Sequence, residues 1–177
     1  MANHGDIDGE PQRIFNYGNF HPNLIRVDEA IFENRTHAFT KKMDIKLNGL
    51  ESLKDTNYYV DYLRGSKWSK SKLEPLVSQN KLAAVNSIEQ GFRKLICGRT
   101  DILISLEIYA YSALKKEEFK NSGIISLSVV GTNLSYPYLH KSHSNIAIKL
   151  AEIIRELKKS GRYNQILKET IPFMFSQ

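Results

Sequence analysis

A helical segment followed by a glycine and an almost wholly apolar strand is the feature that most restricts the fold of this chain. Residues 87–90, Ser-Ile-Glu-Gln, match a capping box at the start of a helix. An apolar face continues at Phe92 and Leu95, and Gly98 is well placed to end the helix. Residues 100–104, Thr-Asp-Ile-Leu-Ile, then read as a short strand. An all-apolar strand after a helix is typical of a parallel sheet covered on both faces, so this segment predicts an α/β fold.

Strands and helices are expected to alternate along most of the remaining sequence. Further strands are predicted at residues 23–27, 36–40, 58–63 and 124–130. A helical turn is predicted at 50–54, helices at 70–77 and 145–160, and a shorter helix around Tyr163, Ile166 and Leu167. The helix at 145–160 has one apolar stripe, formed by Ile146, Ala147, Leu150, Ile153, Ile154 and Leu157. We expect this stripe to face a core, although it would also suit a partner helix.

The N-terminal residues look like the end of a second helix–glycine–strand unit. Residues 5–8, Gly-Asp-Ile-Asp, parallel residues 98–101, Gly-Arg-Thr-Asp, because in both a glycine precedes a strand that starts near an aspartate. If the parallel holds, residues 1–4 are the last turn of a helix. The sequence would then begin inside an element.

Composition favours an ordinary soluble globular protein. Of the 177 residues, 41% are hydrophobic and 25% are charged, which argues against a disordered or fibrous chain. The formal net charge is +6. The basic residues form two small clusters, one at Arg64, Lys67, Lys70 and Lys72 and one at Arg155, Lys158 and Lys159. We interpret both as solvated faces, with anion binding as the alternative, and expect no nucleic-acid partner.

The single cysteine and the hydropathy pattern restrict the setting of the protein only weakly. Cys97 excludes an intrachain disulfide, and its apolar neighbours predict a small core residue. No stretch reaches the roughly 20 apolar residues of a membrane-spanning helix. The first residues lack the basic and apolar regions of a signal peptide.

Sequence motifs for catalysis, metal binding and nucleotide binding are absent. Residues 65–67, Gly-Ser-Lys, lack the upstream glycine of a phosphate-binding loop, and no serine-hydrolase elbow occurs. His140 and His143 share a loop, but two histidines three residues apart are weak evidence for a metal. We therefore expect neither a metal nor a cofactor. Glu107 and His140 are the nameable candidates for acid–base chemistry, and neither has an evident partner.

Three modest motifs occur in a recognisable order. Residues 63–66, Leu-Arg-Gly-Ser, place a Gly-Ser turn after a strand, and residues 98–101 read Gly-Arg-x-Asp. Residues 158–166 read Lys-x-x-Gly-x-Tyr-x-x-Ile. In this order and spacing the chain resembles the bacterial extracellular solute-binding proteins of the polar amino-acid type. The resemblance covers nearly the whole chain.

This resemblance implies an α/β fold with two lobes, the type II periplasmic-binding-protein fold. The first lobe would hold residues 1–37 and 134–177, and the second lobe residues 43–128. Residues 38–42 and 129–133 would form the strands that cross between the lobes. Relative to the family, one βαβ unit at the N-terminus is absent, so the first lobe is expected to be incomplete.

The resemblance also implies ligand-binding residues. An arginine after a first-lobe strand clamps the ligand carboxylate in this family, and Arg13 occupies a comparable place; the alternative is a surface arginine. Gly65 and Ser66 form a turn that can donate hydrogen bonds to an anion, while Ser66 also suits a helix cap. We expect Arg13 and Ser66 to face each other across the cleft between the lobes.

Three further residues are candidates in the second lobe. The family often ends the strand after Asp101 with an acidic residue that binds an α-amino group. Here Leu106 aligns with that position and Glu107 follows it, which departs from the amino-acid pattern. Trp68 and Tyr109 could stack on a ligand, with packing as the alternative for each.

The implied function is the binding of a small polar solute, amino-acid-like or another carboxylate, in a cleft between the lobes. The partner would be an ABC-type membrane transporter or a sensor, and the location periplasmic by resemblance, or cytoplasmic if Met1 is the true start. One alternative is a dehydratase-like enzyme on the same scaffold. Another is a truncated remnant that binds no ligand. An incomplete first lobe also predicts self-association through that lobe.

Overall fold

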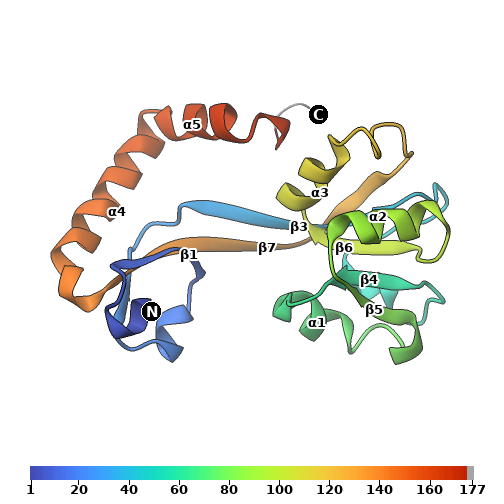
Figure 1. Ribbon diagram of the computed structural model, residues 1–177, viewed down its shortest axis with the longest axis horizontal. Helices are drawn as coiled ribbons and strands as arrows, with labels where there is room; N and C mark the ends of the chain where they lie inside the picture. Colours follow the sequence, from blue (N-terminus) through green and yellow to red (C-terminus); the bar gives the residue numbers. More distant parts are fainter. Residues whose placement is uncertain (175–177) are drawn as a thin grey trace. The chain divides into compact units, whose positions relative to one another are not determined.

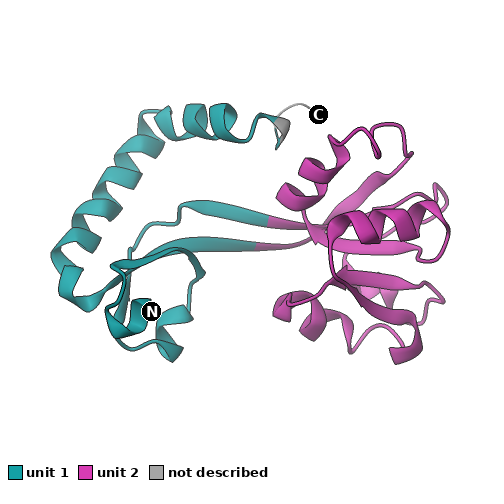
Figure 2. Ribbon diagram, in the orientation of Figure 1, with its two compact units in different colours: residues 1–34, 133–177 teal, residues 35–132 magenta. Residues whose placement is uncertain are grey.

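A computed structural model describes residues 1–174 of the chain (Figure 1). The chain divides into two compact units. Unit 1 consists of residues 1–34 and 133–177, and unit 2 of residues 35–132 (Figure 2). Two long strands, β3 (Phe32–Thr40) and β7 (Ile125–His140), contribute residues to both units. The lobe boundaries expected from the sequence remain a prediction.

Unit 2 is built on a mixed sheet. Its strands follow the order β3-β6-β4-β5, with β4 (Val60–Leu63), β5 (Leu82–Val85) and β6 (Ile102–Leu106). The strand β4 pairs in parallel with both β5 and β6, whereas β3 pairs antiparallel with β6. The all-apolar strand predicted at residues 100–104 is therefore confirmed as part of a parallel pair, although it begins at Ile102.

The sheet of unit 2 is covered on both faces, as the apolar strand predicted. Successive side chains of a strand point to opposite faces. Ile102 and Ile104 accordingly belong to a core cluster with Leu73, on one face of the sheet. Leu103 belongs to a second cluster with Phe92, on the other face. Full burial of each such side chain stabilises the fold by about 1.5–3 kcal/mol.

Three helices cover the two faces of this sheet. They are α1 (Lys67–Leu73), α2 (Ile88–Ile96) and α3 (Glu107–Leu114). One half of the capping box predicted for α2 is confirmed, because the Ser87 side chain accepts a hydrogen bond from the Gln90 amide at 3.1 Å. In place of the other half, the Gln90 side chain accepts from the Asn86 amide and not from that of Ser87. Gly98 follows the helix with φ +66°. The helix predicted at 70–77 was placed too late: α1 begins directly after its cap Ser66 and ends before Pro75, since a proline has no amide to donate to the carbonyl four residues earlier.

Several features of unit 2 differ from the sequence-based expectations. The helix α3 and the strand β5 were not predicted. Strand β6 runs into α3 without a glycine or proline between them, so no local signal separates the two elements. Cys97 is exposed rather than buried in a core, because it lies at the C-terminal end of α2.

Unit 1 combines short strands with two C-terminal helices. The strands β1 (Gly9–Ile14) and β2 (Leu24–Arg26) both pair antiparallel with the last residues of β7. The helices are α4 (Ser144–Lys159) and α5 (Arg162–Thr170), so both helices expected in this region are confirmed. Strand β7 continues to His140, seven residues beyond the strand expected at 124–130 and the crossing segment expected at 129–133. This continuation was not predicted, because Pro137 resembles a strand breaker in the sequence.

The apolar stripe predicted on α4 is only partly buried. Ala147, Ala151 and Ile154 are buried against Val27. Ile146 and Ile153 form a neighbouring row on α4 that is exposed, at 54% and 51%. The expectation that the whole stripe faces a core is therefore wrong for this row.

Short 3₁₀ helices complete the chain. They are η1 (Ala2–His4), η2 (Tyr17–Phe20), η3 (Leu50–Leu53), η4 (Gln79–Lys81), η5 (Lys141–His143) and η6 (Pro172–Met174). The turn expected at 50–54 is η3. At the N-terminus, η1 ends at Gly5 with φ +81°, which matches the predicted parallel with Gly98. Within residues 1–174, no helix is long and apolar enough to cross a membrane.

Candidate functional site

The carboxyl ends of three parallel strands define one edge of unit 2. In the register of the sheet, Leu63 lies opposite Val85, and Tyr62 lies opposite both Ala84 and Ile104. Each of β4, β5 and β6 leads into a helix at this edge, namely α1, α2 and α3; β4 and β5 do so through a turn, and β6 does so directly (Figure 1). We call this edge the strand-end edge. In open α/β sheets, ligands bind outside the carboxyl ends of the strands, so the strand-end edge is the candidate site.

The first turn at this edge is made by Gly65 and Ser66. Gly65 has φ +89°, a conformation that favours glycine. The Ser66 side chain accepts a hydrogen bond from the Ser69 amide at 3.2 Å and donates one to the Ser69 hydroxyl at 2.8 Å. Ser66 therefore caps α1. Its amide donates to the Leu63 carbonyl at 3.1 Å, so a ligand would compete for both of its donors.

The second turn is tied to the first by side-chain hydrogen bonds. The Arg64 Nε donates to the Asn86 Oδ1 at 2.7 Å, and the Arg64 amide donates to the Val85 carbonyl at 2.8 Å. The Asn86 amide in turn donates to Gln90 Oε1 at 2.7 Å. These bonds hold the ends of β4 and β5 together in a fixed geometry.

A buried network of hydrogen-bonded side chains lies where β6 leads into α3. Glu107 is the first residue of α3, and its carboxylate oxygen Oε2 lies 3.1 Å from His37 Nε2. The opposite ring nitrogen, His37 Nδ1, lies 2.7 Å from the Ser126 hydroxyl. Glu107 and His37 are only 7% and 9% exposed. This network joins α3, β3 and β7, and its three residues all belong to unit 2.

Burial governs the protonation of His37. Burial lowers the pKa of the imidazole below its ordinary value, because its effect outweighs that of the Glu107 carboxylate, which raises the pKa. The charge of Arg35 lowers the pKa further. The rings of Phe39 and Tyr111 lie 5.9 Å from the imidazole and account for its apolar surroundings. In the neutral form, Nε2–H donates to Glu107 while Nδ1 accepts from Ser126.

This hydrogen-bonded network was not predictable from the sequence, because its three residues are far apart along it and each looks ordinary alone. Glu107 was a candidate acid–base residue with no evident partner, and His140 was the other candidate. The partner of Glu107 is instead His37. His140 lies in unit 1, where its Nδ1 is 2.8 Å from the Ser142 hydroxyl.

Comparisons with known proteins locate this architecture among solved structures. The L-cystine solute receptor of Neisseria gonorrhoeae, unliganded and open, matches with a TM-score of 0.73 at 16% identity, over 96% of this chain and 70% of that protein. An ancestral arginine-binding protein bound to glutamine matches with a TM-score of 0.66 at 20% identity, over 95% and 72% of the two chains. A histidine kinase sensor domain with similarity to periplasmic binding proteins matches with a TM-score of 0.67 at 13% identity, over 95% and 71%.

The chain has the type II periplasmic-binding-protein fold. An uncharacterized protein of Shewanella oneidensis is 36% identical over 171 residues, which are 95% of this chain. The chain spans 65% of the length of that relative. No protein-family model matches the sequence.

Within this periplasmic-binding-protein fold, Trp68 and Tyr109 occupy different surroundings. Trp68 is half-buried and packs against the core cluster of α1, with its ring next to Gly131. The packing alternative is therefore realised for Trp68. Tyr109 is 51% exposed and lines a groove of about 310 Å³ between α2 and α3. Stacking of either ring on a ligand stays a prediction.

Arg13 lies on β1 in unit 1, whereas the other predicted site residues lie in unit 2. Its guanidinium forms an ion pair with Glu10 and lies 5.0 Å from the centre of the Tyr17 ring. Any carboxylate ligand would have to share Arg13 with Glu10. The expected meeting of Arg13 with Ser66 stays a prediction.

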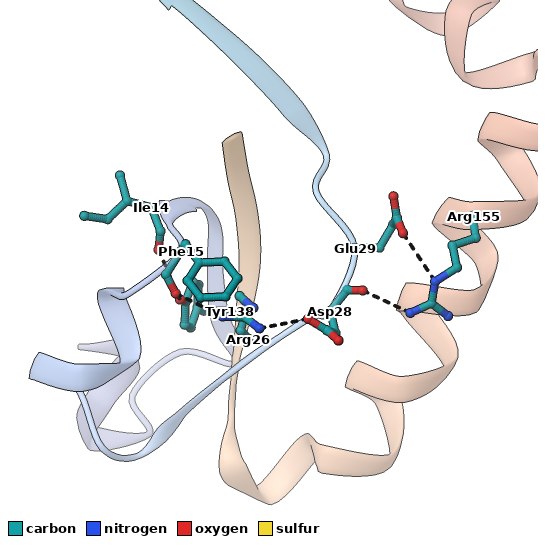
Figure 3. A network of polar contacts seen from close by, with 7 residues as sticks. All are labelled: Ile14, Phe15, Arg26, Asp28, Glu29, Tyr138 and Arg155. Atoms are coloured by element: carbon teal, nitrogen blue, oxygen red, sulfur yellow. Dashed lines mark hydrogen bonds and ion pairs between the residues drawn. The ribbon is translucent and has the colours of Figure 1, made fainter. Parts of the chain in front are cut away.

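A second arginine, Arg26, joins several segments of unit 1 (Figure 3). The guanidinium of Arg26 donates to the Phe15 carbonyl at 3.2 Å and to the Asp28 carboxylate at 2.8 Å. It also lies 3.6 Å from the centre of the Phe15 ring, a cation–π geometry. The Tyr138 hydroxyl donates to the Ile14 carbonyl at 3.0 Å. Arg26 is thus held by its own unit and is not a candidate ligand residue.

The basic cluster on α4 also has structural partners. Arg155 donates to the Asp28 carbonyl at 3.0 Å and forms an ion pair with Glu29 at 3.3 Å (Figure 3). Lys158 pairs with the same carboxylate and also donates to the Ala30 carbonyl at 2.6 Å. The interpretation of this cluster as a purely solvated face is therefore wrong for these two residues, which fasten α4 to residues 28–30.

The histidines of the predicted loop are not arranged as metal ligands. His143 Nε2 lies 3.0 Å from the Asp8 carboxylate. Among residues 1–174, no group of three or more histidine, cysteine or acidic side chains is placed to hold a metal ion.

Proposed function

We propose that this chain binds a small polar solute carrying a carboxylate at the strand-end edge of unit 2, for transport or sensing. The observation that carries the proposal is the convergence of three strand-to-helix junctions at one edge of a sheet whose fold is that of solute-binding proteins. Hydrogen bonds between Arg64, Asn86 and Gln90 preorganise this edge. Preorganised donors lower the cost of ordering a site around a small ligand.

The roles of the individual residues follow from their geometry. Gly65 leaves open space at the turn, since no heavy atom lies within 4 Å of the position a Cβ would take. A ligand can therefore approach the backbone there. Ser66 would turn its hydroxyl from Ser69 to the ligand, and Arg13 would supply a guanidinium from unit 1. Trp68 and Tyr109 would contribute apolar contact.

A membrane transporter or a sensor is the proposed partner, and the periplasm the proposed location. One solved structure with this fold supports each alternative. One is described as the substrate-binding protein of an amino-acid ABC transporter, and the other as a sensor domain of a histidine kinase.

The proposal is tested by thermal melting of the purified chain with a panel of amino acids, dicarboxylates and other small organic acids. Binding to the native state raises the melting temperature in proportion to the logarithm of ligand concentration. We expect at least one carboxylate to raise it at millimolar concentration. A melting temperature that no member of the panel changes would contradict the proposed function and favour a remnant without ligand binding.

The contribution of Arg13 is tested by calorimetry on the Arg13→Ala variant. Loss of a charged hydrogen bond to the carboxylate is expected to weaken binding by about 1.5–3 kcal/mol. The matched control is Arg162→Ala, which removes another exposed arginine of unit 1 that is paired with a glutamate, at 3.1 Å. Unchanged affinity in Arg13→Ala would exclude the clamp role.

A further inference from the structure

The acidic groups at the strand-end edge decide which solutes the edge can hold. An α-amino acid presents a carboxylate and an ammonium group, and the ammonium has three donors and no acceptor. A site for such a ligand needs a carboxylate or several other acceptors that are open to it. The acidic side chains in the first turns of α2 and α3 are Glu89 and Glu107.

Both of these carboxylates already have cationic or N–H partners within unit 2. Glu89 forms an ion pair with Lys116. Glu107 is the more buried of the two and is engaged by His37 Nε2 at 3.1 Å. An ammonium group from a ligand would therefore have to displace an internal partner in either case.

The position of His37 is fixed from both sides of its ring. The Ser126 hydroxyl holds Nδ1 at 2.7 Å, so the imidazole cannot turn away from Glu107 without losing a second hydrogen bond. Phe39 stacks beside the ring at 5.9 Å, and Tyr111 meets it edge-on. His37 can donate to Glu107 whether its ring is neutral or protonated. In the neutral ring the proton sits on Nε2, and in the imidazolium both ring nitrogens carry one.

The charged side chains that flank the first of these turns are cationic. Arg64 and Lys67 flank the Gly65–Ser66 turn and are exposed. Positive charge beside an occupied carboxylate attracts anions and repels ammonium groups.

We infer that the solute of this chain is a small organic acid that presents no ammonium group to Glu107, and that His37 determines this specificity by occupying the Glu107 carboxylate. The inference rests on the proposed function and narrows its ligand class. His37 determines specificity through Glu107 and does not itself contact the solute.

The test compares amino acids with their deamino analogues, which share a carbon skeleton and lack only the ammonium group. The pairs are aspartate and succinate, glutamate and glutarate, and arginine and 5-guanidinopentanoate. Isothermal titration calorimetry on the wild-type chain is expected to give at least tenfold tighter binding for the deamino member of whichever pair binds. Tighter binding of the amino acid would overturn the inference and leave the proposed function intact.

A variant tests the role of His37 directly. His37→Leu leaves Glu107 without its partner and is expected to abolish or invert the preference for the deamino member. His143→Leu is the matched control, since it removes a histidine–aspartate pair of similar length in unit 1. An unchanged preference in folded His37→Leu would overturn the role of His37. If that variant does not fold, His37→Phe takes its place, because it keeps an aromatic ring against Phe39 and Tyr111 and removes both ring nitrogens; an unchanged preference there would equally overturn the role of His37. Binding by no pair at all would contradict the proposed function and the inference with it.

Discussion

Among single residues, Gly131 has a demanding environment because the chain's one tryptophan lies against it. A Cβ at this position would come within 2.5 Å of Cη2 of Trp68. The ring is itself packed on the core cluster of α1 and has little room to withdraw. Glycine at this point of β7 is therefore required by close packing rather than by backbone conformation.

Gly131→Ala should accordingly destabilise unit 2. Overpacking of this kind typically costs about 1–3 kcal/mol. The expected result is a lower midpoint in urea together with a changed emission maximum of Trp68. Gly18→Ala is the control, since its Cβ would meet its nearest neighbours at 3.4 Å. Equal stability of the two variants would mean that the ring of Trp68 moves freely.

Residue-scale contacts were the least predictable part of the candidate site. The cap of α1 by Ser66 could be expected from its place before a helix. The pairing of His37 with Glu107 and Ser126 could not, because it depends on the register that brings β3, β6 and β7 together.

At the scale of elements, local signals determined which predictions succeeded. The helix α2 was predictable because its capping box and the following glycine act within one turn of its ends. The helix α1 was misplaced because the apolar pattern continues past Pro75, whereas the backbone does not. The second half of β7 was missed because pairing with β1 and β2 outweighs the strand-breaking tendency of Pro137.

The start of α2 is joined to the end of α3 by an ion pair that gives the fold a pH dependence. The hydrogen bond from Lys116, the largest cause, lowers the pKa of Glu89 from 4.5 to about 2. Because the folded pKa is depressed, the pair stabilises the fold above about pH 4.5, and this contribution is lost as the pH falls from there towards 2.

Lys116→Gln should remove most of this contribution. The free energy of unfolding is expected to fall at pH 6, and the difference from wild type should disappear as the pH approaches 2. Urea titrations across this pH range measure the effect, with Lys120→Gln as the control because its contact with Glu117 is long, at 3.8 Å, and exposed. A difference that stays constant with pH would mean that Lys116 acts through packing instead of charge.

For the whole molecule, the two units differ in how well their apolar surface is buried. Within the described residues 1–174, unit 2 has two core clusters of nine buried residues each, whereas the clusters of unit 1 contain four and three. Most of the exposed large apolar side chains also lie in unit 1, with Phe20 exposed by 78%. Open apolar surface of this kind favours association.

We therefore propose that the chain, as given, self-associates through unit 1. Sedimentation equilibrium should show a mass that rises with concentration. The double variant Ile146→Lys with Ile153→Lys should shift the equilibrium towards monomer, because both side chains lie on the exposed row of α4. Met43→Lys, which changes an exposed residue of unit 2, should not. A compact monomer whose α4 amides are as protected from hydrogen exchange as those of unit 2 would contradict this proposal.

The central claim is that a carboxylate solute binds at the strand-end edge of unit 2. The most direct test is hydrogen–deuterium exchange of the intact chain with and without the carboxylate that most raises its melting temperature. The account predicts that added protection concentrates at residues 64–68, 86–88 and 106–108, where β4, β5 and β6 meet their helices. Protection confined to other segments, or none at these three junctions, would contradict it.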